Sequence, residues 1–352
     1  MSKWLKSERA INIIIPVFAA VLGLLVGAII MLLGGYDPVY GYEALFNGML
    51  GSPKAIGETI RAMTPLILAG IAVAFAFKTG LFNIGVEGQL LVGWLSAVWV
   101  GYAFELPTVI HIPLAVLVAG FAGAIWGFIP GLLKARFKVH EVIVTIMMNY
   151  IALYITSAII REFLYAGNEK SHNINESASL TSPMLAALTN NSRLHYGIII
   201  ALIAAIVMWF LLNKTTKGFE LKAVGFNQHA SHYAGMSVER NIILSMAISG
   251  AFAGVAGAME GLGTFGYMNT LSAFTGTGFD GIAVALLGAN SAIGIVLAAF
   301  LFGGLKTAAP QMNFMADVPS ELIEIVIALI ILFVASSYII RWFMMRLSKE
   351  GK

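Results

Sequence analysis

The feature that most constrains this chain is a series of apolar segments long enough to cross a lipid bilayer. A membrane-spanning helix needs about 20 mostly apolar residues. Ten apolar segments are present, two of them short or interrupted: 12–34, 60–78, 84–104, 113–133, 142–161, 196–212, 242–262, 281–290, 292–310 and 320–341. Hydrophobic residues make up 59% of the 352 and charged residues only 11%, which is more apolar surface than a soluble core can hide. The sequence predicts an all-α, polytopic membrane protein, a single transmembrane domain over residues 1–352 with about ten helices.

The positions of lysine and arginine predict the orientation of these helices, because positively charged segments stay on the cytoplasmic side. With the N-terminus inside, 15 of the 21 Lys and Arg residues fall in cytoplasmic segments. Residues 213–241 are then cytoplasmic, residues 162–195 lie outside, and both termini face the cytoplasm. We therefore expect a multi-pass protein surrounded by membrane lipid.

The motifs of cofactor-binding proteins and hydrolases are missing or lack their structural context. G-x-G-x-x-G occurs at 261–266 and 276–281, but neither copy follows a strand in a βαβ unit. The chain contains no G-x-x-x-x-G-K-[ST], no G-x-S-x-G, no H-E-x-x-H and no cysteine, and His229 and His232 lack a suitably spaced carboxylate. Basic residues cluster at the ends of apolar segments, a pattern that does not favour nucleic acid. We expect no catalytic residues, no metal and no bound cofactor, so a partner must handle any ATP.

Residues 80–89, G-L-F-N-I-G-V-E-G-Q, separate two apolar runs with polar side chains and glycine. A charged group in the middle of a bilayer costs about 2.5–3.5 kcal/mol on insertion scales, so Asn83, Glu87 and Gln89 favour a protein-lined pathway over a lipid face. The glycines permit non-helical backbone, which is tolerated only inside the bundle or beside water. We therefore expect an interrupted helix that lines a pathway.

A second interruption is expected late in the chain. Residues 281–285, G-I-A-V-A, repeat residues 70–74 letter for letter, and glycine and Asn290 follow. Broken helices at related positions point to a transport pathway. The predicted pathway residues are Asn83, Glu87, Gln89, Asn149, Glu260, Phe279, Asp280 and Asn290.

The segment 213–241, here called the coupling loop, is too long for a tight connection. Val224, Ala230, Tyr233 and Ala234 can share one side of a short helix that lies across the membrane surface. A solvated linker is one interpretation of this loop, and a docking element for a cytosolic protein is the other.

Glycines recur at four-residue spacing in three places. These are Gly123, Gly127 and Gly131, then Gly250 and Gly254, and then Gly257 and Gly261. Such faces let helices approach closely in lipid. We expect tight packing within the chain rather than a subunit interface.

Five stretches together resemble the permease subunits of nucleoside-type ABC importers, which belong with the ribose and branched-chain amino acid permeases. They are G-L-F-N-I-G-V-E-G-Q (80–89), V-H-E-V-I-V-T-I-M-M-N-Y-I (139–151), A-V-G-F-N-Q-H-A-S-H-Y-A-G-M (223–236), S-G-A-F-A-G-V-A-G-A-M-E-G (249–261) and G-F-D-G-I-A-V-A-L-L-G (278–288). The resemblance runs from about residue 60 to about residue 340.

This resemblance implies a helix that couples the permease to an ATP-binding subunit. The residues that match the family pattern are Gly225, Asn227, Ala230, Ala234, Gly235 and Met236. Gln228 and Ser231 depart from the commoner pattern, in which proline and a second alanine are frequent at these two positions. The departures leave open which partner surface the helix contacts.

The resemblance further implies a bacterial cell membrane and several partners: an ATP-binding subunit that carries ATP and Mg, a second homologous permease subunit and an extracytoplasmic substrate-binding lipoprotein. The small-molecule substrate expected from it is a nucleoside, moved inward by alternating access. A simple-sugar (ribose-like) ABC permease is one alternative. An ion-coupled secondary transporter, which needs no partner at the coupling loop, is the other.

Overall fold

The computed structural model describes residues 8–335, and within that range the chain is helical, with isolated β-bridges only. The helices are α1 (Glu8–Leu33), α2 (Pro38–Leu50), α3 (Pro53–Lys78), α4 (Val86–Ala103), α5 (Thr108–Phe137), α6 (Glu141–Ile159), the π-helix η2 (Ile160–Leu164), the 3₁₀-helix η3 (Glu176–Ala178), α7 (Pro183–Leu188), α8 (Gly197–Lys214), α9 (Thr216–Phe226), α10 (Gln228–Tyr233), α11 (Val238–Met259), the π-helix η4 (Glu260–Phe265), α12 (Thr277–Leu287), α13 (Ala292–Ala316) and α14 (Ser320–Ala335). The predicted all-α class is confirmed.

Six helical segments of the described chain are long and apolar enough to cross a membrane. They are Pro53–Lys78, Thr108–Phe137, Glu141–Leu164, Gly197–Lys214, Val238–Phe265 and Ala292–Ala316. Val17–Leu33 and Thr277–Leu287 are apolar but shorter. The expected segment 320–341 coincides with α14 as far as Ala335, and its remainder lies outside the described residues.

Helix α2 was not among the predicted elements, although its start follows familiar rules. The side chain of Asp37 caps it by accepting hydrogen bonds from the backbone N–H groups of Val39 and Tyr40, and Pro38 occupies the first turn. The helix has 13 residues, which is too short to appear in a search for membrane spans. It packs on α13, where Gly48 lies against Ala308.

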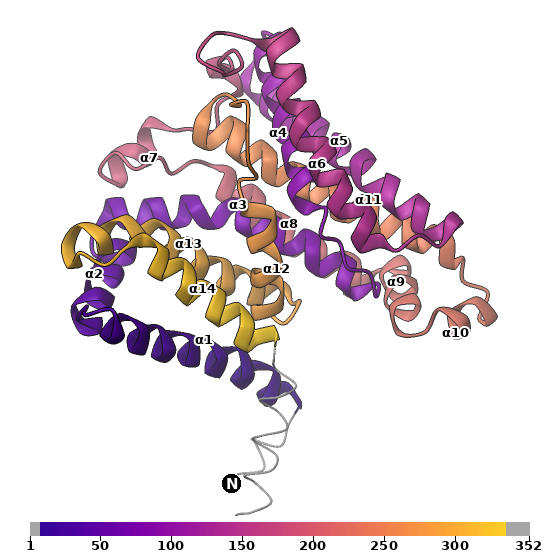
Figure 1. The fold of residues 1–352 in the computed structure, drawn as a ribbon. Helices are drawn as coiled ribbons and strands as arrows, with labels where there is room; N and C mark the ends of the chain where they lie inside the picture. The colour runs from indigo at the N-terminus through magenta and orange to yellow at the C-terminus, as the bar shows by residue number, and fades with distance from the viewer. Residues whose placement is uncertain (1–7, 336–352) are drawn as a thin grey trace, which may run out of the picture.

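Helix α11 lies at the centre of the larger helix group, packed against α5, α4 and α3 (Figure 1). A Cβ on Gly123 of α5 would come within 2.2 Å of the Gly250 carbonyl oxygen, and one on Gly254 within 2.2 Å of the Ala119 carbonyl oxygen. Gly257 is equally close to α4, with the Leu90 carbonyl oxygen 2.0 Å from the Cβ position. The expectation that these glycines serve packing within the chain is confirmed.

The two copies of G-I-A-V-A contact each other in the fold. A Cβ on Gly70 of α3 would lie 2.8 Å from Val284 Cγ1, and one on Gly281 of α12 would lie 2.7 Å from Ala69 Cβ. Both expected breaks are present, because α3 ends at Lys78 before α4 begins at Val86, and α12 ends at Leu287 before α13 begins at Ala292. The helices that precede the two breaks, α3 and α12, are therefore neighbours.

The bundle has two distinct ends. Segment 162–195 lies beside the start of α3 and the end of α4, where Asn175 donates a backbone hydrogen bond to Gly101. The coupling loop lies at the opposite end, beside the end of α3 (Figure 1). Helices α1 and α14 run antiparallel, with Gly23 facing Ile330 and Gly27 facing Val326, so Glu8 and Ala335 lie toward the coupling-loop end.

Candidate substrate pathway

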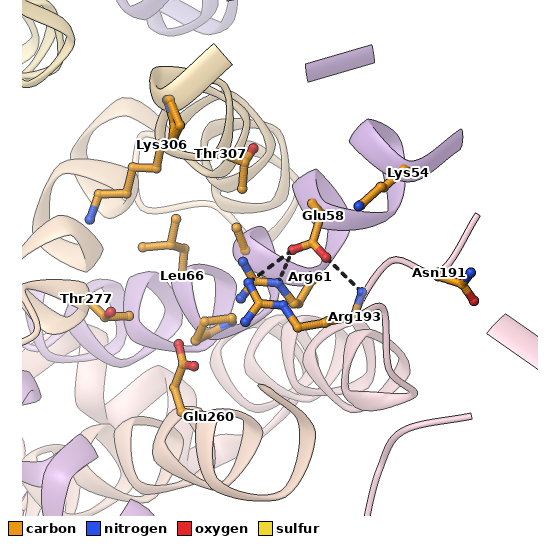
Figure 2. Close-up of a pocket in the computed structure, with 13 residues that line it drawn as sticks. Lys54, Glu58, Arg61, Leu66, Asn191, Arg193, Glu260, Thr277, Lys306 and Thr307 are labelled. Carbon is orange, nitrogen blue, oxygen red and sulfur yellow. Dashed lines mark hydrogen bonds and ion pairs between the residues drawn. The ribbon is translucent and has the colours of Figure 1, made fainter. Parts of the chain in front are cut away.

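A cavity of about 660 Å³, here called the charged cavity, opens at the 162–195 end between α3, α13 and η4 (Figure 2). It is lined by Lys54, Glu58, Arg61, Ala62, Pro65, Leu66, Asn191, Arg193, Glu260, Thr277, Lys306, Thr307 and Pro310. Its volume falls in the range of about 300–1,000 Å³ that is usual for small-molecule sites. Charged, hydroxyl and apolar side chains all reach it, so it can both orient and enclose a polar organic ligand.

Glu58 ties two arginines together at the charged cavity. Its Oε2 lies 2.6 Å from Arg61 Nε and 3.6 Å from the Arg193 guanidinium, and its Oε1 accepts a 2.8 Å hydrogen bond from the Arg193 backbone N–H. Figure 2 shows both guanidinium groups on the same side of the carboxylate. Single ion pairs of exposed groups contribute little, but a shared carboxylate with a backbone bond orders the loop before α8 against α3.

Two predicted pathway residues, Glu260 and Asp280, come together at this cavity. Asp280 of α12 forms an ion pair with Lys306 of α13, whose side chain lines the cavity. Glu260 is the first residue of η4, and Figure 2 shows its carboxylate projecting from the helix into the cavity. Residues of three segments distant in sequence therefore meet at one wall.

Glu87 is fully buried in the first turn of α4 and binds the N-terminus of α12. Its Oε1 accepts hydrogen bonds from Thr275 Oγ1 at 2.7 Å and from the Gly276 N–H at 3.0 Å, and its Oε2 accepts one from the Gly278 N–H at 2.6 Å. A carboxylate at a helix N-terminus satisfies unpaired backbone N–H groups and opposes the positive end of the helix dipole. Glu87 thus joins two interrupted helices.

The amides predicted for the pathway form a buried network next to Glu87. Asn83 Nδ2 donates to Gln89 Oε1 at 2.9 Å and to Ser249 Oγ at 2.8 Å, and Ser249 in turn donates to the Ala72 carbonyl at 2.6 Å. Asn149 accepts from the Gly88 N–H and donates to the Ile84 carbonyl. These bonds satisfy the non-helical backbone around residues 83–88, as buried polar groups require.

Phe279 and Asn290 lie away from this network. Phe279 packs edge-on against Phe274 with ring centroids 5.5 Å apart, and Phe274 packs against Tyr150. Asn290 follows α12 with φ of 51°, and its Oδ1 is buried without a hydrogen bond among the described residues. The structure therefore groups six of the eight predicted residues around Glu87 and the charged cavity, and places Phe279 in an aromatic cluster on α12 and Asn290 in the turn after α12.

The coupling loop contains two short helices, α9 and α10, rather than the single short helix expected over residues 224–234. Asn227 separates them with φ of −158°, and its side chain caps α10 by accepting from the Ala230 N–H. The expectation that Val224 shares a face with Ala230, Tyr233 and Ala234 is wrong. Val224 is buried in a small core with Leu81 and Met246, whereas the other three side chains are exposed.

Gly225 lies near the end of α9, against the turn that ends α3. A Cβ at Gly225 would lie 2.6 Å from the Lys78 carbonyl oxygen and 3.0 Å from the Gly80 nitrogen, so only glycine allows this approach. Gly235 has φ of 82° and open space around it, where glycine is favoured for its conformation. Met236 is partly buried at the start of the return to α11.

His195 is a buried residue at the cavity end that the sequence did not single out. Its Nδ1 accepts a hydrogen bond from the Gly197 N–H at 3.1 Å, while its Nε2 has no partner among the described residues. Burial is the main cause that lowers the pKa of His195 to about 4, with Arg61 adding to the shift and Glu58 opposing it. The imidazole is therefore neutral at physiological pH.

Comparison with known proteins places this architecture in a family. Residues 55–335 match the model of the permease component of the branched-chain amino acid transport system. The chain belongs to this permease family. The permease is also 64% identical to the guanosine ABC transporter permease protein NupP of Bacillus subtilis, over 98% of this chain and 99% of NupP. It is 46% identical to the nucleoside ABC transporter permease protein NupB of Lactococcus lactis, over 95% of this chain and 93% of NupB.

A further relative of the permease is the glucose ABC transporter permease protein TsgB13 of Haloferax volcanii, 36% identical over 92% of this chain and 87% of TsgB13. No solved structure matches the permease significantly. Proteins of this family are membrane transport subunits and not enzymes, and the six apolar helices make this one a multi-pass membrane protein. The family resemblance expected from the five sequence stretches is confirmed.

The charged lining of the cavity in this permease is what sequence reasoning missed. The predicted pathway residues include neither Glu58 nor the four basic residues of the lining, Lys54, Arg61, Arg193 and Lys306. The sequence prediction of orientation counted these four only as positive charges on the outer side. A signal was present, because Arg61 and Lys306 fall inside apolar segments, where a charged residue usually marks a functional site with a partner.

Proposed function

We propose that this chain is a membrane-spanning subunit of an ATP-driven ABC importer for nucleosides. The observation that carries the proposal is its high identity, over nearly the whole chain, to permeases named for guanosine and nucleosides. The sugar-transporter relative is less similar, at 36% identity. The charged cavity supports the proposal as well, because its volume and mixed lining suit a ligand with an apolar ring and several hydrogen-bonding groups.

We propose that the substrate enters at the charged cavity and passes the wall formed by Glu260, Asp280 and the Glu87 contact with α12. Asn83, Gln89 and Asn149 hold the broken backbone of this wall rather than contacting the solute, because their polar atoms are already engaged with each other and with Ser249. Phe279, on α12, and Asn290, in the turn after α12, shape the surroundings of this helix. Alternating access then requires α12 to move relative to α3 and α4.

The coupling loop is proposed to dock on a partner subunit that binds ATP and Mg. The exposed residues at its tip are Ala230, Tyr233, Ala234 and Gly235. The loop packs against the end of α3 through Val224 and Gly225. A small exposed face fits a groove in a partner, and a rigid seat transmits its motion. Asn227 fixes the angle between α9 and α10. Met236 closes the loop.

The complete importer is proposed to contain a second homologous permease and an extracytoplasmic substrate-binding lipoprotein, in a bacterial cell membrane. About ten membrane crossings, with both termini and the coupling loop in the cytoplasm, are proposed for this subunit. The chain has no cysteine of its own, so single cysteines can test the orientation. Asn173→Cys should react with an impermeant maleimide in intact cells and His229→Cys only after lysis, since both side chains are exposed. The reverse pattern would overturn the orientation.

The function itself is tested by uptake in proteoliposomes that contain the purified subunits. The complete set should accumulate guanosine when ATP is supplied on the side of the coupling loop, and glucose or ribose should compete weakly. Uptake by this chain alone, driven by an ion gradient, would instead establish a secondary transporter. Accumulation of the sugar in preference to nucleosides would establish the sugar-permease alternative.

A further inference from the structure

Within residues 8–335, every charged side chain at the cavity takes part in an ion pair except one carboxylate and one lysine. Glu58 is held by Arg61 and Arg193, and Asp280 is held by Lys306. Glu260 forms no ion pair with any residue in the range 8–335, although its side chain lines the cavity. Lys54 lies at the outer rim, on the first turn of α3. Glu260 is therefore the acidic group that remains available to a ligand inside.

The backbone at Glu260 also has an unusual conformation. Helix α11 changes there from an α-helix to the π-helix η4, which runs from Glu260 to Phe265. A π-helical turn is rare and occurs mostly at functional sites, where it re-aims side chains. The bulge ends at Gly266, with φ of 75°, and the chain then leaves toward the start of α12. The change in helix type therefore directs the Glu260 carboxylate into the cavity.

The wall around Glu260 has the parts of a recognition site for a neutral, polar ligand. A carboxylate is an acceptor only, so it requires a ligand that presents donors, and two neighbouring donors can engage both oxygens. Pro65, Leu66 and Pro310 supply apolar contact, and Thr277 places its hydroxyl at the N-terminus of α12. Arg61, Arg193 and Lys306 are close enough to act electrostatically on the carboxylate.

We propose that Glu260 is the specificity-determining residue of this permease, which binds the substrate during translocation through a pair of adjacent hydrogen-bond donors. This inference rests on the proposed nucleoside function. A nucleoside has two donor pairs of this kind: the cis hydroxyls of ribose and, in guanosine, the ring N–H with the neighbouring amino group. Both pairs present the same chemistry to a carboxylate, and they are distinguished by analogues that lack one of them.

The test uses the complete reconstituted importer with saturating, substrate-loaded binding protein, so that affinity of the binding protein does not limit uptake. Guanosine, inosine and 2′,3′-dideoxyguanosine are compared for wild type, Glu260→Gln and Glu260→Asp. Glu105→Gln, at an exposed position between α4 and α5, is the matched control. Glu260→Gln should lower the guanosine rate roughly tenfold to a hundredfold, the range for a hydrogen bond to a charged group. Glu260→Asp should restore part of it.

The analogues identify the donors. If the ribose hydroxyls bind Glu260, the dideoxy analogue is slow in wild type and insensitive to Glu260→Gln. If the base binds, inosine, which keeps the ring N–H but lacks the amino group, is slower than guanosine in wild type and less sensitive to Glu260→Gln. Equal rates for wild type and Glu260→Gln, or the same fold loss for all three substrates, would overturn the proposal. Failure of the wild type to take up any nucleoside would instead reject the proposed function.

A binding measurement separates recognition from movement. Thr277→Cys places a single thiol in this chain at the cavity wall, and guanosine should slow its reaction with maleimide in the assembled, ATP-free importer. The protection should disappear when Glu260→Gln is combined with Thr277→Cys. Full protection in the double variant would show that guanosine binds without Glu260, and it would overturn the proposal even if transport were impaired.

Discussion

The two ends of the helix bundle are held together by different kinds of contact. At the cavity end, charged side chains carry the contacts, with Glu58 on Arg61 and Arg193 and with Lys306 on Asp280. At the coupling-loop end, backbone packs directly against backbone. A Cβ added to Gly225 would lie only 2.6 Å from the Lys78 carbonyl oxygen. Ion pairs between partly exposed groups can exchange partners at low cost, whereas a close-packed backbone contact cannot deform gradually.

This difference suits the separate tasks proposed for the two ends. A ligand with hydrogen-bonding groups can enter a cavity whose polar side chains reorient. The motion of a partner subunit, in contrast, is transmitted to the helices only through a rigid contact. Glu87 lies between the two ends. On one side, the chain runs from the turn at Gly80 through Asn83 into α4, which carries Glu87. On the other side, Glu87 accepts hydrogen bonds from the N–H groups on either side of Thr277, which lines the cavity. The predictions below separate the stiff end, the connection and the cavity end, in decreasing order of expected effect.

Ala234→Trp should abolish uptake and substrate-stimulated ATP hydrolysis, since a bulky ring on the exposed tip of the coupling loop blocks seating in a groove. Membrane insertion and capture of the loaded binding protein should persist, because neither depends on that tip. Co-purification with the ATP-binding subunit and ATPase assays measure the effect. Ala166→Trp, at an exposed position of the 162–195 end, is the control and should behave as wild type. Retention of both ATPase stimulation and co-purification by Ala234→Trp would favour a secondary transporter.

Glu87→Leu should remove the attachment of α12 to α4, leaving the Gly276 and Gly278 N–H groups without their acceptor. We expect loss of transport and a lower thermal unfolding temperature. Glu87→Gln should retain part of the contact, at a cost of about 1–3 kcal/mol, because one amide N–H then faces a backbone donor. Thermal unfolding in detergent, with Glu105→Gln as control, measures both. Wild-type transport by Glu87→Leu would show that this connection is dispensable.

Gly225→Ala should weaken the seat of the coupling loop by about 1–3 kcal/mol, the usual cost of overpacking, since the added methyl group meets the Lys78 carbonyl. The expected result is a lower ratio of nucleoside transported to ATP hydrolysed. Gly235→Asn provides the contrast, because asparagine tolerates a positive φ and the site has open space. If both variants showed the same transport ratio, the close contact at Gly225 would have no part in coupling.

Most of the helix positions were predictable from the sequence, because the thickness of a bilayer fixes the length of an apolar helix. The expected segment 60–78 ends where α3 ends, but α3 begins earlier, at Pro53. The missing turns contain Lys54 and Glu58, whose charged groups line the cavity, where Glu58 pairs with Arg61. A hydropathy window cannot detect such a turn, since it weighs each charge as if it were unpaired.

The site was predictable as a set of residue types and not as a set of contacts. Polar residues next to glycine within an apolar run identified Asn83, Glu87 and Gln89 as buried and functional candidates. Their partners could not be predicted from the sequence. The donors to Glu87 lie at 275–278, far away in the chain, and two of the three are backbone N–H groups, which every residue type except proline has. The division of the coupling loop at Asn227 follows from local capping, which a single amphipathic pattern across 224–234 overlooks.

The smallest predicted effect concerns His195 at the cavity end, and it has a definite sign. Burial lowers its pKa in the folded protein to about 4 from its ordinary value of 6.5, so the unfolded chain binds the proton first as the pH falls. Stability from this group is therefore present above about pH 6.5 and declines as the pH falls toward 4. Between pH 7 and pH 6 the free energy of unfolding should fall by about 0.7 kcal/mol on account of His195.

Thermal unfolding of the purified subunit at a series of pH values measures this decline, and His195→Gln provides the comparison because glutamine does not titrate. The difference between wild type and His195→Gln should shrink or change sign as the pH falls. Parallel curves for wild type and His195→Gln between pH 7 and pH 5 would mean that the imidazole is not buried as a neutral group. The cavity end would then be more open to water than the contacts of Glu58 and Arg193 imply, and the contrast with the close-packed coupling-loop end would become larger.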